Sequence, residues 1–168
     1  MTTLSDHCIY TIASGVRLNA EANTRRPVQF TEKKTWTTGY RLWQDAKADG
    51  RPMPILLADA ADCSRILYWG LLTGIETGDG ATTYTVDRVR PLPGKHAPQD
   101  LILRSTDRQI APHFIRPYAI CRTPRFLQQP SRTTRSTEPP PAGSVPSARS
   151  RSDVRQAAGT SSRRRSVS

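Results

Sequence analysis

The chain has 168 residues, of which 36% are hydrophobic, and a formal net charge of +11. This length accommodates one ordinary domain with an appendage and excludes a large multidomain protein. The longest apolar stretch, residues 66–75, is about half as long as a membrane-spanning helix, and the first residues lack the pattern of a signal peptide, so we expect a soluble, cytoplasmic protein with no membrane partner.

The composition changes near residue 128. Residues 128–168 contain eight arginines, two acidic residues and no aromatic side chain, whereas every Trp, Tyr and Phe lies within residues 1–127. Such a segment cannot bury enough apolar area to offset about 1–2 kcal/mol per residue of ordering entropy. The sequence therefore predicts a folded domain over residues 1–127 and a disordered arginine-rich tail over residues 128–168. Two interpretations of this tail stand side by side: it binds polyanions, or it is an arginine-rich terminus with no selected role.

Three widely spaced cysteines, Cys8, Cys63 and Cys121, each lie beside apolar residues. This pattern is typical of reduced, buried thiols in a cytosolic protein. No cysteine or histidine spacing matches a structural zinc site. We therefore expect no metal and no cofactor.

The first half of the domain contains the strongest helix signal. Residues 8–12 alternate and are β-branched, which predicts a strand, whereas residues 13–23 fit either a short helix or an irregular crossing. Residues 28–30 fit a brief strand. Tyr40, Trp43 and Lys47 recur at helical spacing, and this predicts a helix over residues 38–48 with Thr38 as its cap and Gly50 at its end.

The second half is predicted to be β-structure. The expected strands cover residues 53–58, 64–76, 82–89, 101–103 and 114–121, with a hairpin at residues 79–80. Gly70 and Gly74 indicate bends or bulges in the long strand, and Pro117 indicates an edge or a bulge. The fold class is therefore α+β: a small mixed or mostly antiparallel β-barrel with one or two packed helices.

Aromatic side chains are the leading candidates for a binding site. Aromatic side chains at helical spacing usually fill a hydrophobic core, and a core position is the favoured interpretation for Tyr40 and Trp43. Tyr68 and Trp69 are adjacent in a strand and therefore point to opposite faces, so that one can face a ligand. Trp36 precedes the predicted helix cap, at a position where helices hold anions.

A family resemblance is carried by the run Lys34-Thr35-Trp36-Thr37-Thr38-Gly39, the helix after it, the apolar strand at 54–59 and the glycine-bearing strand at 66–75. This order resembles the PUA-like superfamily, which includes the EVE, ASCH and SRA groups. The resemblance covers residues 8–121 in element order and residues 34–76 in residue character. It implies a small β-barrel that binds RNA, or DNA with a modified base, which several members hold flipped out. It further implies a base-binding pocket lined by Trp36, Thr37, Thr38 and Trp69.

Strand arginines are the second candidate group. Arginines two residues apart on a strand face the same side, so Arg88 and Arg90, with Arg116, are expected to contact phosphates along one edge of the sheet. A solvated strand face is an equally open interpretation.

Catalytic patterns are weak. Asp59 and Asp62 can hold Mg²⁺ in a small nuclease or hydrolase, and Cys63 with His7 or His113 can form a nucleophile and base. An exposed acidic loop and a buried structural thiol are the favoured interpretations. The sequence thus favours a non-catalytic module that binds nucleic acid, either RNA or modified DNA. A metal-dependent nuclease or hydrolase and a protein-interaction module are the alternatives.

Overall fold

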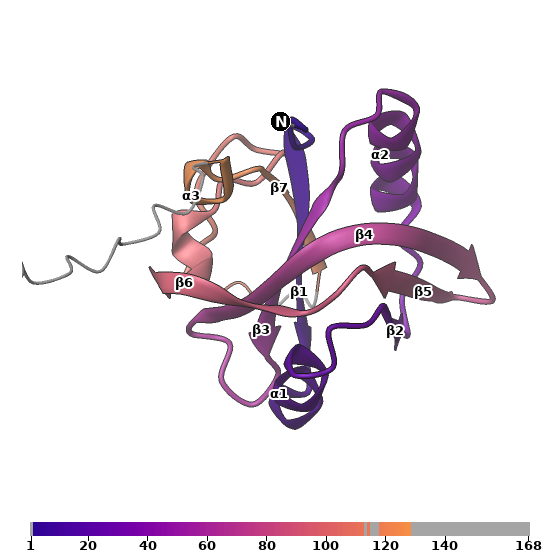
Figure 1. The fold of residues 1–168 in the computed structure, drawn as a ribbon. Helices are drawn as coiled ribbons and strands as arrows, with labels where there is room; N and C mark the ends of the chain where they lie inside the picture. Colours follow the sequence, from indigo (N-terminus) through magenta and orange to yellow (C-terminus); the bar gives the residue numbers. More distant parts are fainter. Residues whose placement is uncertain (1, 113, 115–117, 129–168) are drawn as a thin grey trace, which may run out of the picture. The chain divides into compact units, whose positions relative to one another are not determined.

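The chain forms a mixed α+β fold in a computed structural model that describes residues 2–112, 114 and 118–128 (Figure 1). All described residues fall within one compact unit. The elements are, in chain order, β1 (His7–Ala13), α1 (Gly15–Ala22), β2 (Val28–Glu32), α2 (Thr37–Ala48), β3 (Pro54–Asp59), β4 (Ile66–Gly78), β5 (Ala81–Val86), β6 (Arg90–His96), the 3₁₀ turn η1 (Pro98–Asp100), β7 (Tyr118–Arg122) and α3 (Arg125–Gln128).

The strands form one seven-stranded sheet in the order β2-β5-β4-β3-β1-β7, with β6 paired to β4 off this path. β1 and β3 are parallel, and the other pairs are antiparallel. A parallel pair needs a long crossover, which α1, β2 and α2 provide. β4 bends across the molecule (Figure 1), so that its first half pairs with β3 and β6 and its second half pairs with β5.

Two of the three glycines of β4 mark a bulge and a close contact with β5. The β4–β5 register shifts between Leu72 and Gly74, which confirms the predicted bulge. A Cβ atom at Gly70 would lie 2.2 Å from Val86 Cγ1 and 2.6 Å from the Arg88 carbonyl oxygen. Only glycine therefore lets β4 approach the end of β5 this closely.

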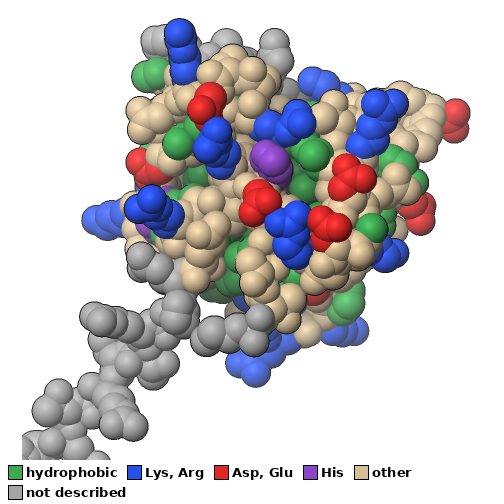
Figure 2. Space-filling view, turned by 90° about the horizontal axis from the view of Figure 1, so that it is seen from above, with side chains coloured by type: hydrophobic (Ala, Val, Ile, Leu, Met, Phe, Trp, Pro, Cys, Tyr) green, Lys and Arg blue, Asp and Glu red, His purple; other side chains and the backbone are tan. Residues whose placement is uncertain are grey.

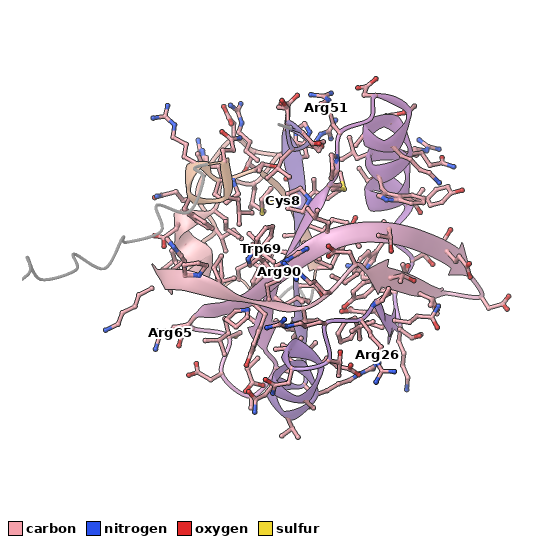
Figure 3. The ribbon with its side chains drawn as sticks, viewed as in Figure 1. Cys8, Arg26, Arg51, Arg65, Trp69 and Arg90 are labelled. Atoms are coloured by element: carbon pink, nitrogen blue, oxygen red, sulfur yellow. The ribbon has the colours of Figure 1, made fainter. Side chains whose placement is uncertain are left out.

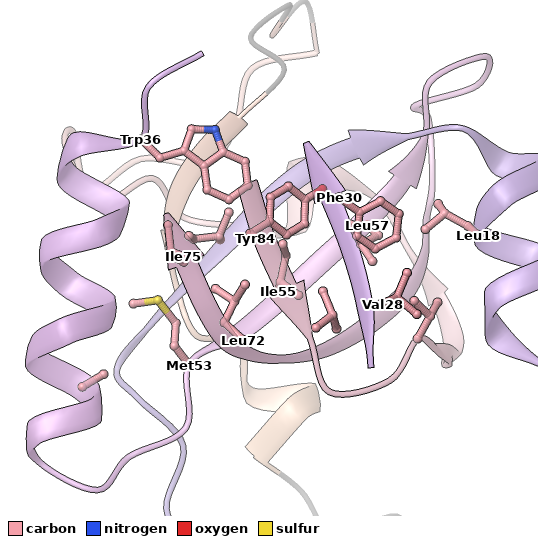
Figure 4. Close-up of a cluster of buried hydrophobic side chains, with 14 residues drawn as sticks. Leu18, Val28, Phe30, Trp36, Met53, Ile55, Leu57, Leu72, Ile75 and Tyr84 are labelled. Atoms are coloured by element: carbon pink, nitrogen blue, oxygen red, sulfur yellow. The ribbon is translucent and has the colours of Figure 1, made fainter. Parts of the chain in front are cut away.

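The hydrophobic core consists of two clusters, one on each face of β3. Ile55 and Leu57 belong to one cluster, and Leu56 and Ala58 belong to the other. A strand buried on both faces has a continuous apolar sequence, as observed here. The first cluster, which contains Trp36, is drawn in Figure 4.

The predicted barrel closure is wrong: in the described part of the chain no strand pairing joins β2 to β7. Stacked rings occupy this opening instead. The Trp36 ring lies between Tyr84 of β5 and Tyr118 of β7, with centroids 4.6 Å and 4.7 Å away, and Phe30 of β2 stacks on Tyr84 at 5.3 Å. The four rings, from Phe30 of β2 to Tyr118 of β7, therefore fill the gap between two strands that do not pair.

Several element boundaries differ from the sequence prediction. Ile102 and Leu103 form isolated bridges, and the strand predicted over residues 101–103 does not form. β6 escaped prediction because Pro91, Pro93 and Gly94 disfavour strands. The N-cap of α2 is Trp36, so Thr38 lies inside the first turn, whereas Gly50 follows the helix with a φ of 66° as expected.

The predicted edge at Pro117 and the predicted tail beyond its first residue, Gln128, lie outside the described residues. Gln128 ends α3, so this helix extends across the domain boundary that we expected after residue 127. Within the described ranges, none of the helices combines the length and the apolar character needed to span a bilayer.

Candidate functional site

The structure does not bring the two predicted pocket tryptophans together. Trp36 is fully buried in the cluster of Figure 4, where Trp36, Tyr84 and Phe30 lie in a row. Trp69 is half-buried and packs against the other cluster, whereas Tyr68 packs against the first, as their opposite strand positions predicted. Thr37 and Thr38 are exposed on the first turn of α2.

Trp69 and Arg90 contact each other (Figure 3). The Arg90 guanidinium lies 4.9 Å from the Trp69 ring centroid and also pairs with Asp87, with 3.1 Å between Nη1 and Oδ1. Arg88 is exposed in the segment between β5 and β6. Arg88 and Arg90 therefore do not form the expected pair on one strand, and Arg116 lies outside the described residues.

The side chains that were candidates for catalysis either hydrogen-bond with neighbouring residues or are exposed to solvent. Asp59 Oδ1 accepts the Gly15 N–H at 3.0 Å and the Ala61 N–H at 2.9 Å, so this carboxylate binds the start of α1. The hydrogen bonds from Ser64 lower the pKa of Asp62. In the described ranges, no three His, Cys, Asp or Glu side chains gather as metal ligands. Cys63 is exposed, which corrects the predicted buried thiol, whereas Cys8 and Cys121 are buried as expected.

A cavity of about 320 Å³ lies at the N-terminal end of α2. It includes one predicted pocket residue, Thr38, and it is lined by neither Trp36 nor Trp69. Its wall combines two cations, two hydroxyls and two aromatic rings from distant parts of the chain: Lys34, Thr38, Arg104, Ser105, Phe114 and Tyr118.

Hydrogen bonds from neighbouring strands position this wall. The buried Thr82 hydroxyl of β5 accepts the Trp36 N–H at 2.9 Å and donates to the Lys34 carbonyl at 2.7 Å. The Tyr118 hydroxyl of β7 accepts the Gly39 N–H at 3.0 Å. Because the N-cap residue of α2 makes no side-chain cap, Tyr118 supplies the acceptor that a cap would normally provide.

The cavity is electropositive. In the part of the chain that the structure describes, neither Lys34 nor Arg104 has a carboxylate within ion-pair distance. The N-terminal end of α2 adds a partial positive charge. The field of Arg104 reaches beyond the cavity, since after burial it is the next cause that lowers the pKa of His7. An anionic group is the ligand that this wall favours.

The cavity also borders the end of the aromatic stack. Trp36 covers one face of Tyr118 with an angle of 8° between the rings, and the Lys34 Nζ lies 5.9 Å from the centroid of Tyr118. Tyr118 and Lys34 thus line the cavity together, with Trp36 behind the tyrosine ring. Burial raises the pKa of Tyr118 above its ordinary value of 10, and the Gly39 N–H partly opposes this shift.

Basic side chains do not dominate the face of the molecule shown in Figure 2. On the face shown in Figure 2, lysines and arginines alternate with acidic side chains. This face therefore has no broad basic patch.

The sequence pattern indicates the segment that contributes Lys34 and Thr38 to this cavity, but not the segments that contribute its other polar and aromatic residues. Lys34 and Thr38 belong to the run of residues 34–39 that carried the family resemblance. Arg104, Ser105 and Tyr118 come from segments more than 60 residues later, which tertiary pairing alone brings to α2. Searches for similar proteins found no match among family models, curated proteins or solved structures.

Proposed function

We propose that this chain is a non-catalytic nucleic-acid-binding module of the PUA-like type, with its base-binding site in the cavity at the start of α2. A base stacks on Tyr118 and hydrogen-bonds with Thr38 and Ser105, while Lys34 and Arg104 contact phosphate. One observation carries the proposal: an aromatic stack ends at a cavity with two cations that have no carboxylate within ion-pair distance among the described residues.

The two halves of this wall suit the two halves of a nucleotide. Stacking on an aromatic side chain contributes about 1–3 kcal/mol per base and tolerates any base. Phosphate contacts with lysine and arginine add affinity that weakens as salt rises, because counterions are released on binding. The volume of about 320 Å³ lies at the lower end of the range for small-ligand sites.

Because Trp36 is buried, we propose that it holds Tyr118 in place and does not contact the base itself. The indole stacks behind Tyr118, and the Tyr118 hydroxyl binds the N–H of Gly39. The ring that receives the base is therefore held on one face and at its hydroxyl before any ligand arrives. Such preorganisation reduces the ordering cost of binding.

Fluorescence anisotropy with a labelled single-stranded oligonucleotide tests the proposal in the full chain. We expect Lys34→Ala and Arg104→Ala each to weaken binding and to reduce the slope of log K against log salt by about 1. The matched control is Arg41→Ala, since Arg41 is exposed on α2 and lies outside the cavity. The arginine-rich tail is present in every variant, so differences between variants report the cavity.

Two results would contradict the proposal. One is unchanged affinity and salt slope in both cavity variants, relative to Arg41→Ala. The other is metal-dependent cleavage of the oligonucleotide that Asp59→Asn abolishes, which would favour the nuclease alternative. A stoichiometric protein that co-purifies without nucleic acid would indicate the interaction module instead.

A further inference from the structure

A second cavity, of about 510 Å³, lies beside β7. It also combines cations with rings, and its wall includes His96, Ile102, Arg122, Arg125 and Phe126. The His96 and Phe126 rings stack with centroids 3.8 Å apart and an angle of 18° between them. Unlike the cavity at α2, it also contains a carboxylate, Asp100, whose Oδ2 lies 4.0 Å from the Nδ1 of His96.

One short antiparallel pairing connects the two cavities. The Arg104 N–H donates to the Ile120 carbonyl at 2.9 Å, and the Arg122 N–H donates to the Ile102 carbonyl at 2.8 Å. Arg104 and Ile120 line the cavity at α2, whereas Ile102 and Arg122 line the second cavity. The two cavities are therefore built on consecutive parts of the same backbone ladder.

The side chains of this ladder alternate between its two faces. The bridge between Leu103 and Cys121 places these two residues on one face, where Cys121 is buried in the core. Arg104 and Arg122 consequently lie on the other face, and both are exposed. Two residues of strand separate Ile120 from Arg122, which is a distance of about 7 Å, comparable with one nucleotide of an extended strand.

The two arginines of the second cavity are available to an anion, because the carboxylate of this cavity, Asp100, lies within ion-pair distance of His96 and of neither arginine. Arg122 pairs with Asp107 at 2.7 Å, but both side chains are more than half exposed, and such pairs contribute about 0–1 kcal/mol. Arg125 has no ion-pair partner within the described residues. A phosphate can therefore replace Asp107 at low cost.

We propose, building on the function proposed above, that the ligand is a single strand that continues from the cavity at α2 into the second cavity. One base stacks on Tyr118, the neighbouring nucleotide occupies the second cavity beside Phe126, and Arg104 and Arg122 contact phosphates along the ladder between them. The strand is single because bases must be unstacked and unpaired to enter two separate cavities.

Binding of thymidine 5′-monophosphate and of a series of oligothymidylates to the full chain tests this path at about 0.15 M salt, the physiological ionic strength. The test variant is Arg122→Ala with Arg125→Ala, and its matched control is Arg26→Ala with Arg41→Ala, because Arg26 and Arg41 are exposed and line neither cavity. We expect the test variant to bind the mononucleotide within twofold of the control. We expect it to bind oligothymidylates of two or more nucleotides at least tenfold more weakly than the control does.

Three outcomes overturn the path, and they separate it from the proposed function. Equal oligothymidylate affinity of the test and control variants refutes the path. If Arg104→Ala still weakens binding in that case, the site in the cavity at α2 stands. A duplex that competes as well as the single strand refutes a single-stranded ligand. If neither Arg104→Ala nor the double variant changes binding, both proposals fail.

Discussion

Tyr118 links stability and the proposed function within one residue. Its ring continues the aromatic stack, and its hydroxyl accepts the Gly39 N–H at the start of α2. Tyr118→Phe keeps the ring and removes the acceptor. We expect a loss of about 1 kcal/mol in the free energy of unfolding, the usual cost of losing a helix cap.

The two roles of Tyr118 can be measured separately. Urea denaturation reports the cap, whereas oligonucleotide affinity of the folded variant reports the ring. Affinity close to that of the unmutated chain is expected for Tyr118→Phe. A Tyr118→Phe variant that keeps its stability would show that the hydroxyl does not cap α2.

Glu32 is a second residue with a measurable signature. Burial raises its pKa above 4.5, although a hydrogen bond from Thr11 and the charge of Lys34 partly oppose this shift. The folded state therefore holds this proton more tightly than the unfolded chain does. Stability must fall as pH rises from the ordinary value of 4.5 through the raised value.

Glu32→Gln removes this titration and keeps an acceptor for the Thr11 hydroxyl. We expect the variant to lose the decline in stability that begins near pH 4.5 and to be at least as stable as the unmutated chain at about pH 7. Melting temperatures across this range measure the effect, and the exposed Glu76→Gln serves as a control. An unchanged pH profile in Glu32→Gln would contradict the burial of this carboxylate.

At the scale of elements, the bend of β4 depends on a close contact with the end of β5. Gly70→Ala would place a methyl group 2.2 Å from Val86 Cγ1 and 2.6 Å from the Arg88 carbonyl. Relief requires backbone movement, so we expect a loss of about 1–3 kcal/mol in stability.

A matched glycine in the same strand controls for this substitution. Among the described residues, no atom lies within 4 Å of the position that an added Cβ atom would occupy at Gly78, and the φ of Gly78 is not positive. Gly78→Ala should therefore leave the urea midpoint unchanged or raise it slightly. Equal destabilisation by the two substitutions would indicate that strand flexibility, and not the contact with β5, determines the effect.

The elements themselves were largely predictable from local patterns. The helix over residues 38–48, the strand over 8–12 and the bulge near Gly74 are confirmed, because periodicity and glycine placement act over a few residues. β6 was missed because its prolines conceal a strand that pairs with β4. Thr38 was assigned the cap that Tyr118 provides, because no local pattern reveals an acceptor 79 residues away.

At the scale of the whole molecule, side chains take the place of strand pairing at the opening between β2 and β7. Trp36→Ala removes the ring between Tyr84 and Tyr118, and we expect a loss of about 3–5 kcal/mol, which is typical for a buried aromatic residue. Trp36→Phe retains a stacked ring and should recover part of this loss. If Trp36→Ala unfolds at the same urea concentration as the unmutated chain, the aromatic stack does not support the fold.

The arginine-rich tail is expected to contribute to binding and not to stability. Residues 128–168 contain eight of the 25 basic residues and no aromatic side chain. We expect their removal to leave the melting temperature nearly unchanged and to lower the salt dependence of oligonucleotide binding. Binding that vanishes with the tail, rather than weakening, would contradict a site in the cavity at α2.

The sequence by itself determined the α+β class, most of the element order and the apolar strand at the centre of the sheet. These follow from hydrophobic periodicity and turn residues, which act over short spans of chain. The tertiary structure decided that the sheet stays open, that Trp36 is buried, and that Lys34, Arg104 and Tyr118 share a cavity. The physical reason is that ring stacking and strand pairing join residues far apart in the chain, and no local pattern encodes these contacts.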